Sequence, residues 1–281
     1  MIGQRRLLYT INKQIEDERF PQFALFVGED GFGKRTLMNE ISKHWKYKYV
    51  CQDVKVATIR NMIDVAYRTT QEGKCVYIIP DAHKMSLQAK NALLKIVEEP
   101  PLYATFLMSA DSETSILGTI KSRAVVYRLE SYSKLELKEY LSKHPEAQDE
   151  EFILSISNSI SDINKALRID PGDMMKHINS ILDKADSISY ANLLKSVQFI
   201  SVKEEDDGFD LGLYWRAFNV ECIKRIMDEV DYSTVEMYRG MILATHNSIF
   251  KLSITGINKS MLYDEWILSI RRCRESVNDY K

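Results

Sequence analysis

The sequence predicts an α/β fold with a parallel sheet in its first half and an all-helical region in its second half. Four short, largely apolar runs lie between residues 23 and 129, and segments with helical periodicity separate them. Strands that are apolar on both faces and alternate with helices are typical of a parallel sheet covered on both sides. After residue 129 no convincing strand follows, and the apolar residues recur at helical spacing.

The first half is expected to place its strands at three buried runs and one shorter run. Ser86 suits a helix N-cap, and Pro100 and Pro101 should stop the same helix. The segment 43–49, KHWKYKY, invites a nucleic-acid interpretation, but it more simply ends one helix and begins the next strand. The expected elements are, in order, helix 4–19, strand 23–27, helix 37–45, helix 58–74, strand 76–80, helix 86–101, strand 104–110 and strand 124–129.

The second half is expected to contain only helices. Pro171 and Gly172 mark a boundary within it, and residues 203–208 are a charged linker. These signals divide the chain into domains at 1–129, 130–171 and 172–281. The expected helices lie at 133–143, 149–157, 162–167, 174–185, 190–200, 211–230, 234–252 and 261–277.

Composition excludes several classes of protein. The chain has 281 residues, of which 45% are hydrophobic and 28% charged, as in ordinary globular proteins with two or three domains. The net charge of −2 gives no global signature of nucleic-acid binding. Four scattered cysteines form no C-x-x-C pair, so we expect neither zinc nor a disulfide framework. We expect a cytoplasmic protein with no signal peptide and no membrane span.

The segment GEDGFGKRT at residues 28–36 joins the first predicted strand to a helix. A strand, a glycine-rich turn and a helix in that order form a phosphate cradle, because backbone N–H groups point at the anion. The pattern G-x-x-x-x-G-K is complete in Gly28, Gly33 and Lys34. Gly31 and Gly33 would let the backbone turn toward a phosphate, and Lys34 would supply a positive charge. The plainer alternative is a glycine turn with a solvated lysine.

The residue after the lysine departs from the nucleotide-binding pattern. A Ser or Thr hydroxyl should ligate Mg²⁺ there, but Arg35 occupies the position and Thr36 comes one residue late. The guanidinium of Arg35 could project where the metal would sit, or it could point to solvent from the helix N-terminus. Local helix geometry does not decide between the two.

Three further motifs accompany this loop: IGQRRLL at 2–8, NALLKIVEEPP at 91–101 and TIKSR at 119–123. Together they resemble the clamp-loader branch of the AAA+ ATPases, and more narrowly the delta-prime subunits of bacterial or phage DNA polymerase III. The similarity is strong over residues 2–129, weak to residue 171 and faint at the C-terminus. The resemblance implies an AAA+ domain at 1–129, a three-helix lid at 130–171 and a helical oligomerisation collar at 172–281.

The resemblance also implies that the acidic motif for metal and catalysis is incomplete. Alignment of A-H-K-M with the family's A-D-K-M places the metal-binding Asp at Pro80 and the catalytic Glu at Asp81. A shift of one residue makes Asp81 the metal ligand but puts Ala82 at the position of the base. Either register leaves the pair of acids incomplete.

The sensing residues of the family are only partly matched. The ATP-sensing arginine of the lid falls on Asn164, and Lys165 points to a different face. The first sensor falls near Asp111. By contrast, Ser122 and Arg123 match the family's arginine finger, which reaches the ATP of a neighbouring subunit. A guanidinium suits that task because its donors are planar and permanently charged. On spacing alone, a surface ion pair would explain Arg123 equally well.

The resemblance further implies contacts with DNA and with other subunits. Helices beginning at Thr58 and Ser86 could track the phosphate backbone, with Arg60, Lys84 and Lys90 as candidate contacts. Each of these three cations could instead be an ordinary solvated residue. The apolar C-terminal residues would form the core first and an interface second; they are Tyr214, Trp215, Phe218, Trp266 and Ile267.

We therefore expect an ATPase-deficient clamp-loader subunit that supplies Arg123 in trans and helps place a sliding clamp on primer–template DNA. Its partners would be the other subunits of a hetero-pentamer, the clamp and DNA. It would require no cofactor and no metal, although ATP or ADP could bind without Mg²⁺. The main alternative is an active motor subunit of the same loader, in which Thr36 and Asp81 replace the missing groups. A third is an AAA+ adaptor unrelated to replication.

Overall fold

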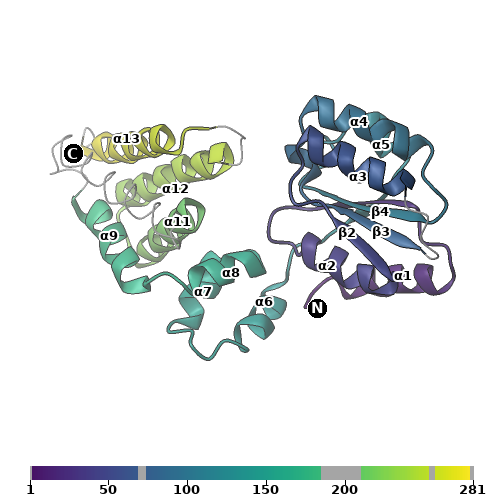
Figure 1. Ribbon diagram of the computed structural model, residues 1–281. Helices are drawn as coiled ribbons and strands as arrows, with labels where there is room; N and C mark the ends of the chain where they lie inside the picture. The colour runs from purple at the N-terminus through teal and green to yellow at the C-terminus, as the bar shows by residue number, and fades with distance from the viewer. Residues whose placement is uncertain (1, 69–73, 185–209, 253–256, 279–281) are drawn as a thin grey trace. The chain divides into compact units, whose positions relative to one another are not determined.

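The computed structural model describes residues 2–68, 74–184, 210–252 and 257–278. Packing divides the chain into two compact units (Figure 1). The first takes in the chain up to Tyr140 together with Ser159–Ser161, and the second takes in Leu141–Asn158 and the chain from Asp162 onward. The expected helix at 190–200 and linker at 203–208 lie outside the described residues.

The first unit contains a parallel five-stranded sheet, which confirms the predicted fold class. The strand order is β2-β3-β4-β1-β5, and every neighbouring pair is parallel. The four predicted strands are present, and the fifth begins within the segment 43–49 as expected. The strands are β1 (Phe23–Val27), β2 (Tyr47–Val50), β3 (Cys75–Ile79), β4 (Ala104–Ala110) and β5 (Val125–Arg128).

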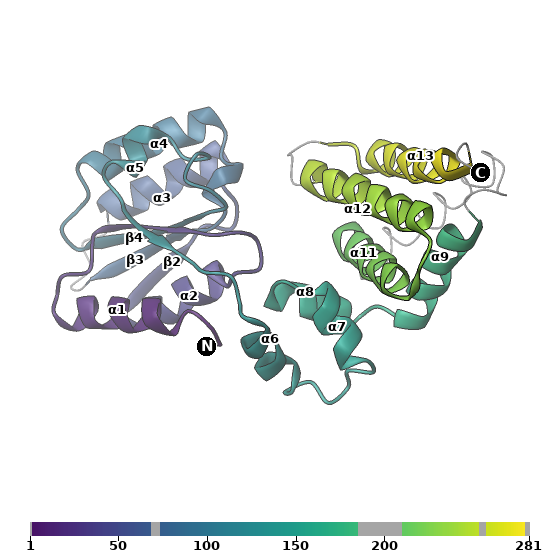
Figure 2. The same cartoon turned by 180° about the vertical axis from the view of Figure 1, so that it is seen from behind.

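Helices cover both faces of this sheet, as the two views in Figures 1 and 2 show. On one face α1 (Arg5–Glu16) and α2 (Lys34–Ile41) bury Ile11 and Leu37 against Phe26 of β1. The other face is covered by α3 (Val56–Arg68), α4 (Leu87–Glu98) and α5 (Gly118–Lys121), which pack on the alternate residues of β1. Because both faces are covered, β1 and β3 are buried at every position, whereas the edge strand β2 alternates half-buried with exposed side chains.

Helix α4 begins and ends where Ser86 and the two prolines predicted. The hydroxyl of Ser86 accepts the N–H of Ala89 at 3.2 Å, which is the N-cap contact expected of a serine. The helix ends at Glu98, just before Pro100 and Pro101. A short 3-10 helix, η2 (Ala82–Lys84), precedes it and is joined to β3 by Pro80 and Asp81.

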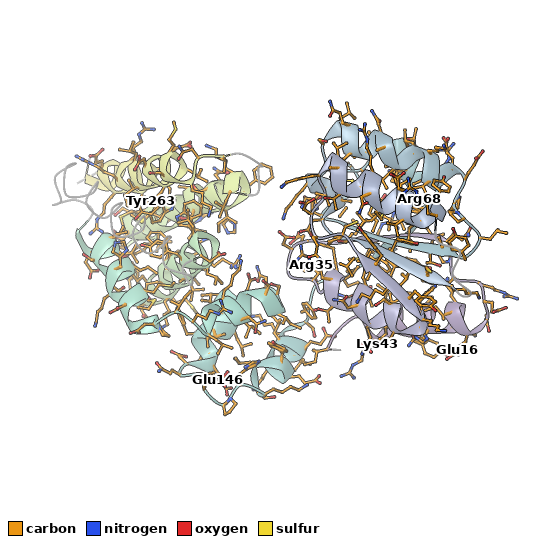
Figure 3. The ribbon with its side chains drawn as sticks, in the orientation of Figure 1. Glu16, Arg35, Lys43, Arg68, Glu146 and Tyr263 are labelled. Carbon is orange, nitrogen blue, oxygen red and sulfur yellow. The ribbon has the colours of Figure 1, made fainter. Side chains whose placement is uncertain are left out.

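The second unit is built from helices. Its core is an aromatic cluster in which Trp266 lies 5.0 Å from Phe218 and 5.9 Å from Trp215, measured between ring centroids. Tyr263 belongs to the same interior (Figure 3). The five apolar residues singled out in the C-terminal helices are therefore core residues, which was the first of the two roles expected for them. The helices from residue 134 onward are α6 (Lys134–Leu141), which falls almost wholly in the first unit, and then α7 (Glu150–Ile156), α8 (Ile160–Ala166), α9 (Pro171–Lys184), α11 (Leu211–Asp228), α12 (Tyr232–Leu252) and α13 (Lys259–Asn278).

The three-domain division at residues 129 and 171 stays a prediction, since packing defines two units. Pro171 is the first residue of α9, a position that suits proline because its missing N–H would be unpaired there anyway. Within the described residues, every helix is too short or too polar to cross a membrane.

Candidate functional site

The glycine-rich loop lies between β1 and α2, at the carboxyl end of the sheet. Gly31 and Gly33 both have left-handed backbone angles, with φ of 86° and 84°, which favour glycine. Gly33 is also the N-cap of α2. A Cβ at position 31 would come 2.3 Å from the Oγ of Ser159, so the loop packs closely against that residue. The glycines expected to shape a phosphate cradle do give the loop its turn.

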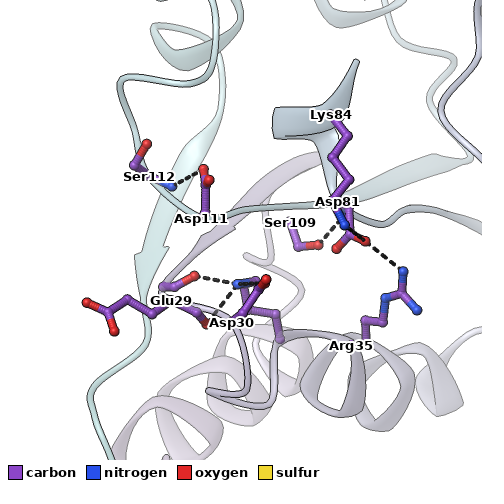
Figure 4. A network of polar contacts seen from close by, with 10 residues as sticks. Glu29, Asp30, Arg35, Asp81, Lys84, Ser109, Asp111 and Ser112 are labelled. Carbon is purple, nitrogen blue, oxygen red and sulfur yellow. Dashed lines mark hydrogen bonds and ion pairs between the residues drawn. The ribbon is translucent and has the colours of Figure 1, made fainter. Parts of the chain in front are cut away.

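Lys34 folds back onto this loop. Its side chain is only 5% exposed, and Nζ donates to the carbonyl oxygens of Gly28 and Glu29, the latter at 2.9 Å (Figure 4). The carboxylate of Asp30 lies 3.6 Å from the same ammonium. The loop therefore contains its own acceptors and its own counter-charge for the lysine that a phosphate would otherwise engage.

Arg35 pairs with an acid at the end of β3. Its Nη2 lies 2.7 Å from Oδ2 of Asp81, and Lys84 lies 3.3 Å from the same oxygen (Figure 4). Burial alone would raise the pKa of Asp81, but the positive charges of Arg35 and Lys84 outweigh it and hold the pKa below its ordinary value. Arg35 is still 67% exposed, so it lies at the surface of the first unit while holding this contact. The guanidinium of Arg35 thus contacts the acidic motif at Asp81.

The backbone at Asp81 is unusual and is held in place by its neighbours. Asp81 has φ 52° and ψ 44°, a left-handed conformation that few residues other than glycine adopt. Its N–H donates to the hydroxyl of Ser109, a fully buried residue of β4, at 3.0 Å. Sequence reasoning missed Ser109, because a serine inside an apolar strand carries no signal of its own.

This arrangement does not fit a Mg²⁺ ion. Arg35 occupies the position of the hydroxyl ligand, Pro80 has no ligating side chain, and the carboxylate of Asp81 is already paired with two cations. Thr36 is exposed one residue further along α2. Across the described ranges, no group of three or more His, Cys, Asp or Glu side chains is placed to hold a metal.

The other sensing positions are spread over both units. Asp111 directly follows β4 and accepts the N–H of Ser112 at 2.6 Å. Burial would raise the pKa of Asp111, but a hydrogen bond from Ser115 and the nearby His83 lower it overall. In the second unit Asn164 is exposed on α8, and Lys165 pairs with Asp210 at 2.7 Å. Lys165 is thus engaged by its own unit.

Arg123 lies just after α5, at the surface of the first unit. Its Nη2 lies 3.1 Å from Oε1 of Glu98, so it does take part in a surface ion pair. Nη1 donates to the carbonyl oxygen of Thr119 at 3.1 Å and lies 3.5 Å from the hydroxyl of Ser122. The side chain nevertheless stays 42% exposed. Glu98 was not singled out from the sequence, because its partner lies 25 residues further along the chain.

The candidate DNA contacts differ in their surroundings. Lys84 is paired with Asp81, and Lys90 donates to the carbonyl oxygen of Ser115 at 2.6 Å. Arg60 is exposed on α3 and borders a groove of about 540 Å³. The groove lies between α3 and α4, and its other lining residues are Ile63, Asp64, Gln88, Asn91, Ala92 and Lys95.

Comparison with known proteins finds relatives among the subunits of DNA polymerase III. The family described as "DNA polymerase III, delta subunit" matches residues 47–133. The DNA polymerase III subunit delta' of Buchnera aphidicola (strain Bp) is 26% identical, over 85% of this chain and 76% of that protein. The DNA polymerase III subunit gamma of Buchnera aphidicola (strain Sg) is 27% identical, over 56% of this chain and 53% of that protein. The chain therefore spans about half the length of this gamma subunit.

A solved structure supports the fold. The gamma subunit-related protein of Thermotoga maritima superposes with a TM-score of 0.52 at 16% identity, covering 95% of this chain and 99% of that one. At this identity the likeness speaks for the fold alone. The glycine loop, the parallel sheet and the motifs that contain Glu98 and Arg123 agree with these relatives, and the chain resembles the clamp-loader branch of the AAA+ family.

Proposed function

We propose that this chain is a delta-prime-type clamp-loader subunit that does not hydrolyse ATP itself. Instead it would supply Arg123 to the ATP held by a neighbouring gamma-type subunit. It would act in a DNA polymerase III type replicase, where the complex loads a sliding clamp onto primed DNA. Relatives named gamma and delta' are about equally similar, so the distinction rests on the site residues.

The Arg35–Asp81 ion pair is the observation that carries the proposal. ATP hydrolysis in P-loop enzymes needs a divalent ion that bridges the terminal phosphates and neutralises their developing charge. Here a guanidinium contacts the acid that would have to support that ion. A divalent cation near Asp81 would be repelled by Arg35 and Lys84, and Pro80 offers it no replacement ligand. We infer a chain that turns over no ATP in cis.

The trans function rests on a different part of the same unit. Arg123 is exposed, carries a permanent charge, and belongs to the motif TIKSR. Arginine fingers of this kind raise phosphoryl-transfer rates by about 10³- to 10⁵-fold in other P-loop enzymes. The residues needed for hydrolysis in cis are thus altered, while the residue that would serve another subunit's ATP is kept.

The proposal includes partners and conditions. The partners would be the other subunits of a hetero-pentamer, the sliding clamp and primer–template DNA, with Arg60 as the candidate phosphate contact. No cofactor would be required, and ATP or ADP could bind the glycine loop without Mg²⁺. The protein would act in the cytoplasm, where replication takes place.

One observation favours the second candidate, an active motor subunit. The glycine loop keeps its turn, and Lys34 lies within it. Activity would require the Arg35–Asp81 pair to open so that Asp81 and Thr36 could replace the missing groups. We favour the first candidate because opening that pair still leaves Pro80 at the metal position.

Two assays test the proposal. The purified chain should show no Mg²⁺-dependent ATP turnover; turnover that is lost in Lys34→Ala would favour the motor subunit instead. In the complex isolated through a tag on this chain, Arg123→Ala should reduce ATP turnover without changing subunit content. Arg128→Ala is the matched control, since Arg128 is an exposed arginine of the same segment that pairs with Glu113. Equal turnover in the two variants would remove the trans role.

A further inference from the structure

Arg123 is held by its own chain on two sides. Nη2 lies 3.1 Å from the carboxylate of Glu98, and Nη1 donates to the carbonyl oxygen of Thr119 at 3.1 Å. A guanidinium has five N–H donors in a planar fork, so these contacts and the longer one to Ser122 still leave donors for an acceptor outside the chain. The side chain is therefore oriented while much of it stays in solvent.

The position of Glu98 follows from the packing of α4. Glu98 is the last residue of this helix, and Leu93 and Ile96 of the helix are fully buried under the sheet. The carboxyl end of a helix carries a partial negative charge, which is unfavourable for an acid and favourable for a nearby cation. Glu98 and the helix end thus attract a guanidinium together. Ile120, buried in the same core, fixes α5 and with it the backbone that carries Arg123.

We infer that Glu98 is a positioning residue for Arg123, an inference that rests on the proposed trans function. A free arginine samples many rotamers, most of which point away from any single target. Glu98 restricts that sampling before the subunits meet, so less ordering is left for the neighbour's nucleotide to impose. Glu98 itself touches no nucleotide. It acts only through the direction it gives to the guanidinium.

The expected effect is modest, because both partners are about half exposed. Exposed ion pairs contribute little, and on that basis loss of Glu98 should lower the stimulated turnover about two- to five-fold. The change should fall on kcat at saturating ATP and leave the KM for ATP unchanged, since only the delivery of the finger is affected. Salt screens exposed pairs, so the difference from wild type should shrink as ionic strength rises.

The experiment measures ATP turnover of the complex isolated through a tag on this chain, at low and at high salt. Glu98→Gln removes the charge, and Glu98→Asp keeps it one methylene shorter and should recover part of the rate. Glu99→Gln is the matched control, because Glu99 is the adjacent exposed acid and its contact to Tyr67 uses the backbone carbonyl. In the Arg123→Ala background, Glu98→Gln should have no further effect.

The outcomes separate this inference from the function on which it rests. If Arg123→Ala lowers turnover but Glu98→Gln matches Glu99→Gln, the positioning role is wrong and the trans function stands. If Arg123→Ala has no effect, the trans function fails and the positioning role fails with it. A loss in Glu98→Gln that persists equally at high salt, or that adds to Arg123→Ala, would indicate a general structural defect and overturn the inference.

Discussion

Substitution of Asp81 should separate two effects of this residue on the stability of the first unit. One is the ion pairing of its carboxylate, and the other is the strain of its left-handed backbone. Asp81→Asn removes the carboxylate that pairs with Arg35 and Lys84. It keeps a side chain that tolerates the left-handed backbone, since asparagine and aspartate both adopt it more readily than most residues. Asp81→Ala removes the charge and also that tolerance. The difference between the two variants therefore reports the backbone strain at φ 52°.

The size of the stability loss can be worked out from the solvent exposure of the two cations that pair with Asp81. Arg35 is 67% and Lys84 is 59% exposed, so solvent screens both pairs, and together they should contribute about 1 kcal/mol to the first unit. Alanine in the left-handed region should cost about 1 kcal/mol more. The hydrogen bond from the N–H of Asp81 to Ser109 is common to all variants and cancels. We expect losses of about 1 kcal/mol for Asp81→Asn and about 2 kcal/mol for Asp81→Ala.

Amide hydrogen exchange in β1, β3 and β4 is the suitable assay, because it reads the opening free energy of the first unit separately from that of the second. The pKa of Asp81 is lowered in the folded state, so its contribution is present above the ordinary value of 3.8 and is lost as pH falls below that value. Asp81→Asn should lack this acid-dependent component. Equal losses for the two variants would refute the strain argument, and no coupling between Asp81→Asn and Arg35→Gln would refute the ion pair.

Three further predictions concern other parts of the chain. Gly31→Ala should destabilise the first unit by roughly 1–3 kcal/mol in the same exchange assay, because φ is 86° and the new Cβ would meet Ser159, whereas Gly118→Ala, with nothing within 4 Å, should be neutral. Burial lowers the pKa of His177 from 6.5 to about 4, so the second unit should lose about 2 kcal/mol between pH 7 and pH 5, as the unfolded imidazole takes up a proton that the folded one does not; urea titrations followed by tryptophan fluorescence should show this slope, and His177→Gln should abolish it. Burial raises the pKa of the Cys51 and Cys222 thiols to about 12, so neither should react with a thiol reagent at pH 7 until urea unfolds the chain, and rapid modification of both in the native protein would contradict the packing.

The fold was largely predictable because its central strands consist almost entirely of apolar residues. β1 and β3 are buried along their whole length, so uninterrupted apolar runs marked them. β2 was harder to predict from the sequence. It is an edge strand whose side chains alternate between half-buried and exposed, so it lacks an uninterrupted apolar run. The helix ends around Ser86 and Pro100 were also predictable, because capping and termination depend on residues next to each other in the chain.

The sequence singles out individual residues of the candidate site but not the contacts between them. Sequence patterns singled out Arg35 and Asp81 separately, yet their pairing depends on the left-handed turn at Asp81 and on Ser109 from another strand. The partner of Arg123 was hidden for a related reason. Glu98 belongs to a helix that the core places beside α5, and no local periodicity records that proximity.

The pairing of Arg35 with Asp81 has a consequence for how this sequence can change. A single replacement of Arg35 by serine would restore one ligand type but would leave Asp81 without its closest counter-charge and Pro80 still in place. A single replacement of Pro80 by aspartate would add a carboxylate beside a guanidinium that already holds one. Either substitution alone disturbs the Arg35–Asp81 pair without completing a set of Mg²⁺ ligands, so a metal site at this position would require at least two substitutions together.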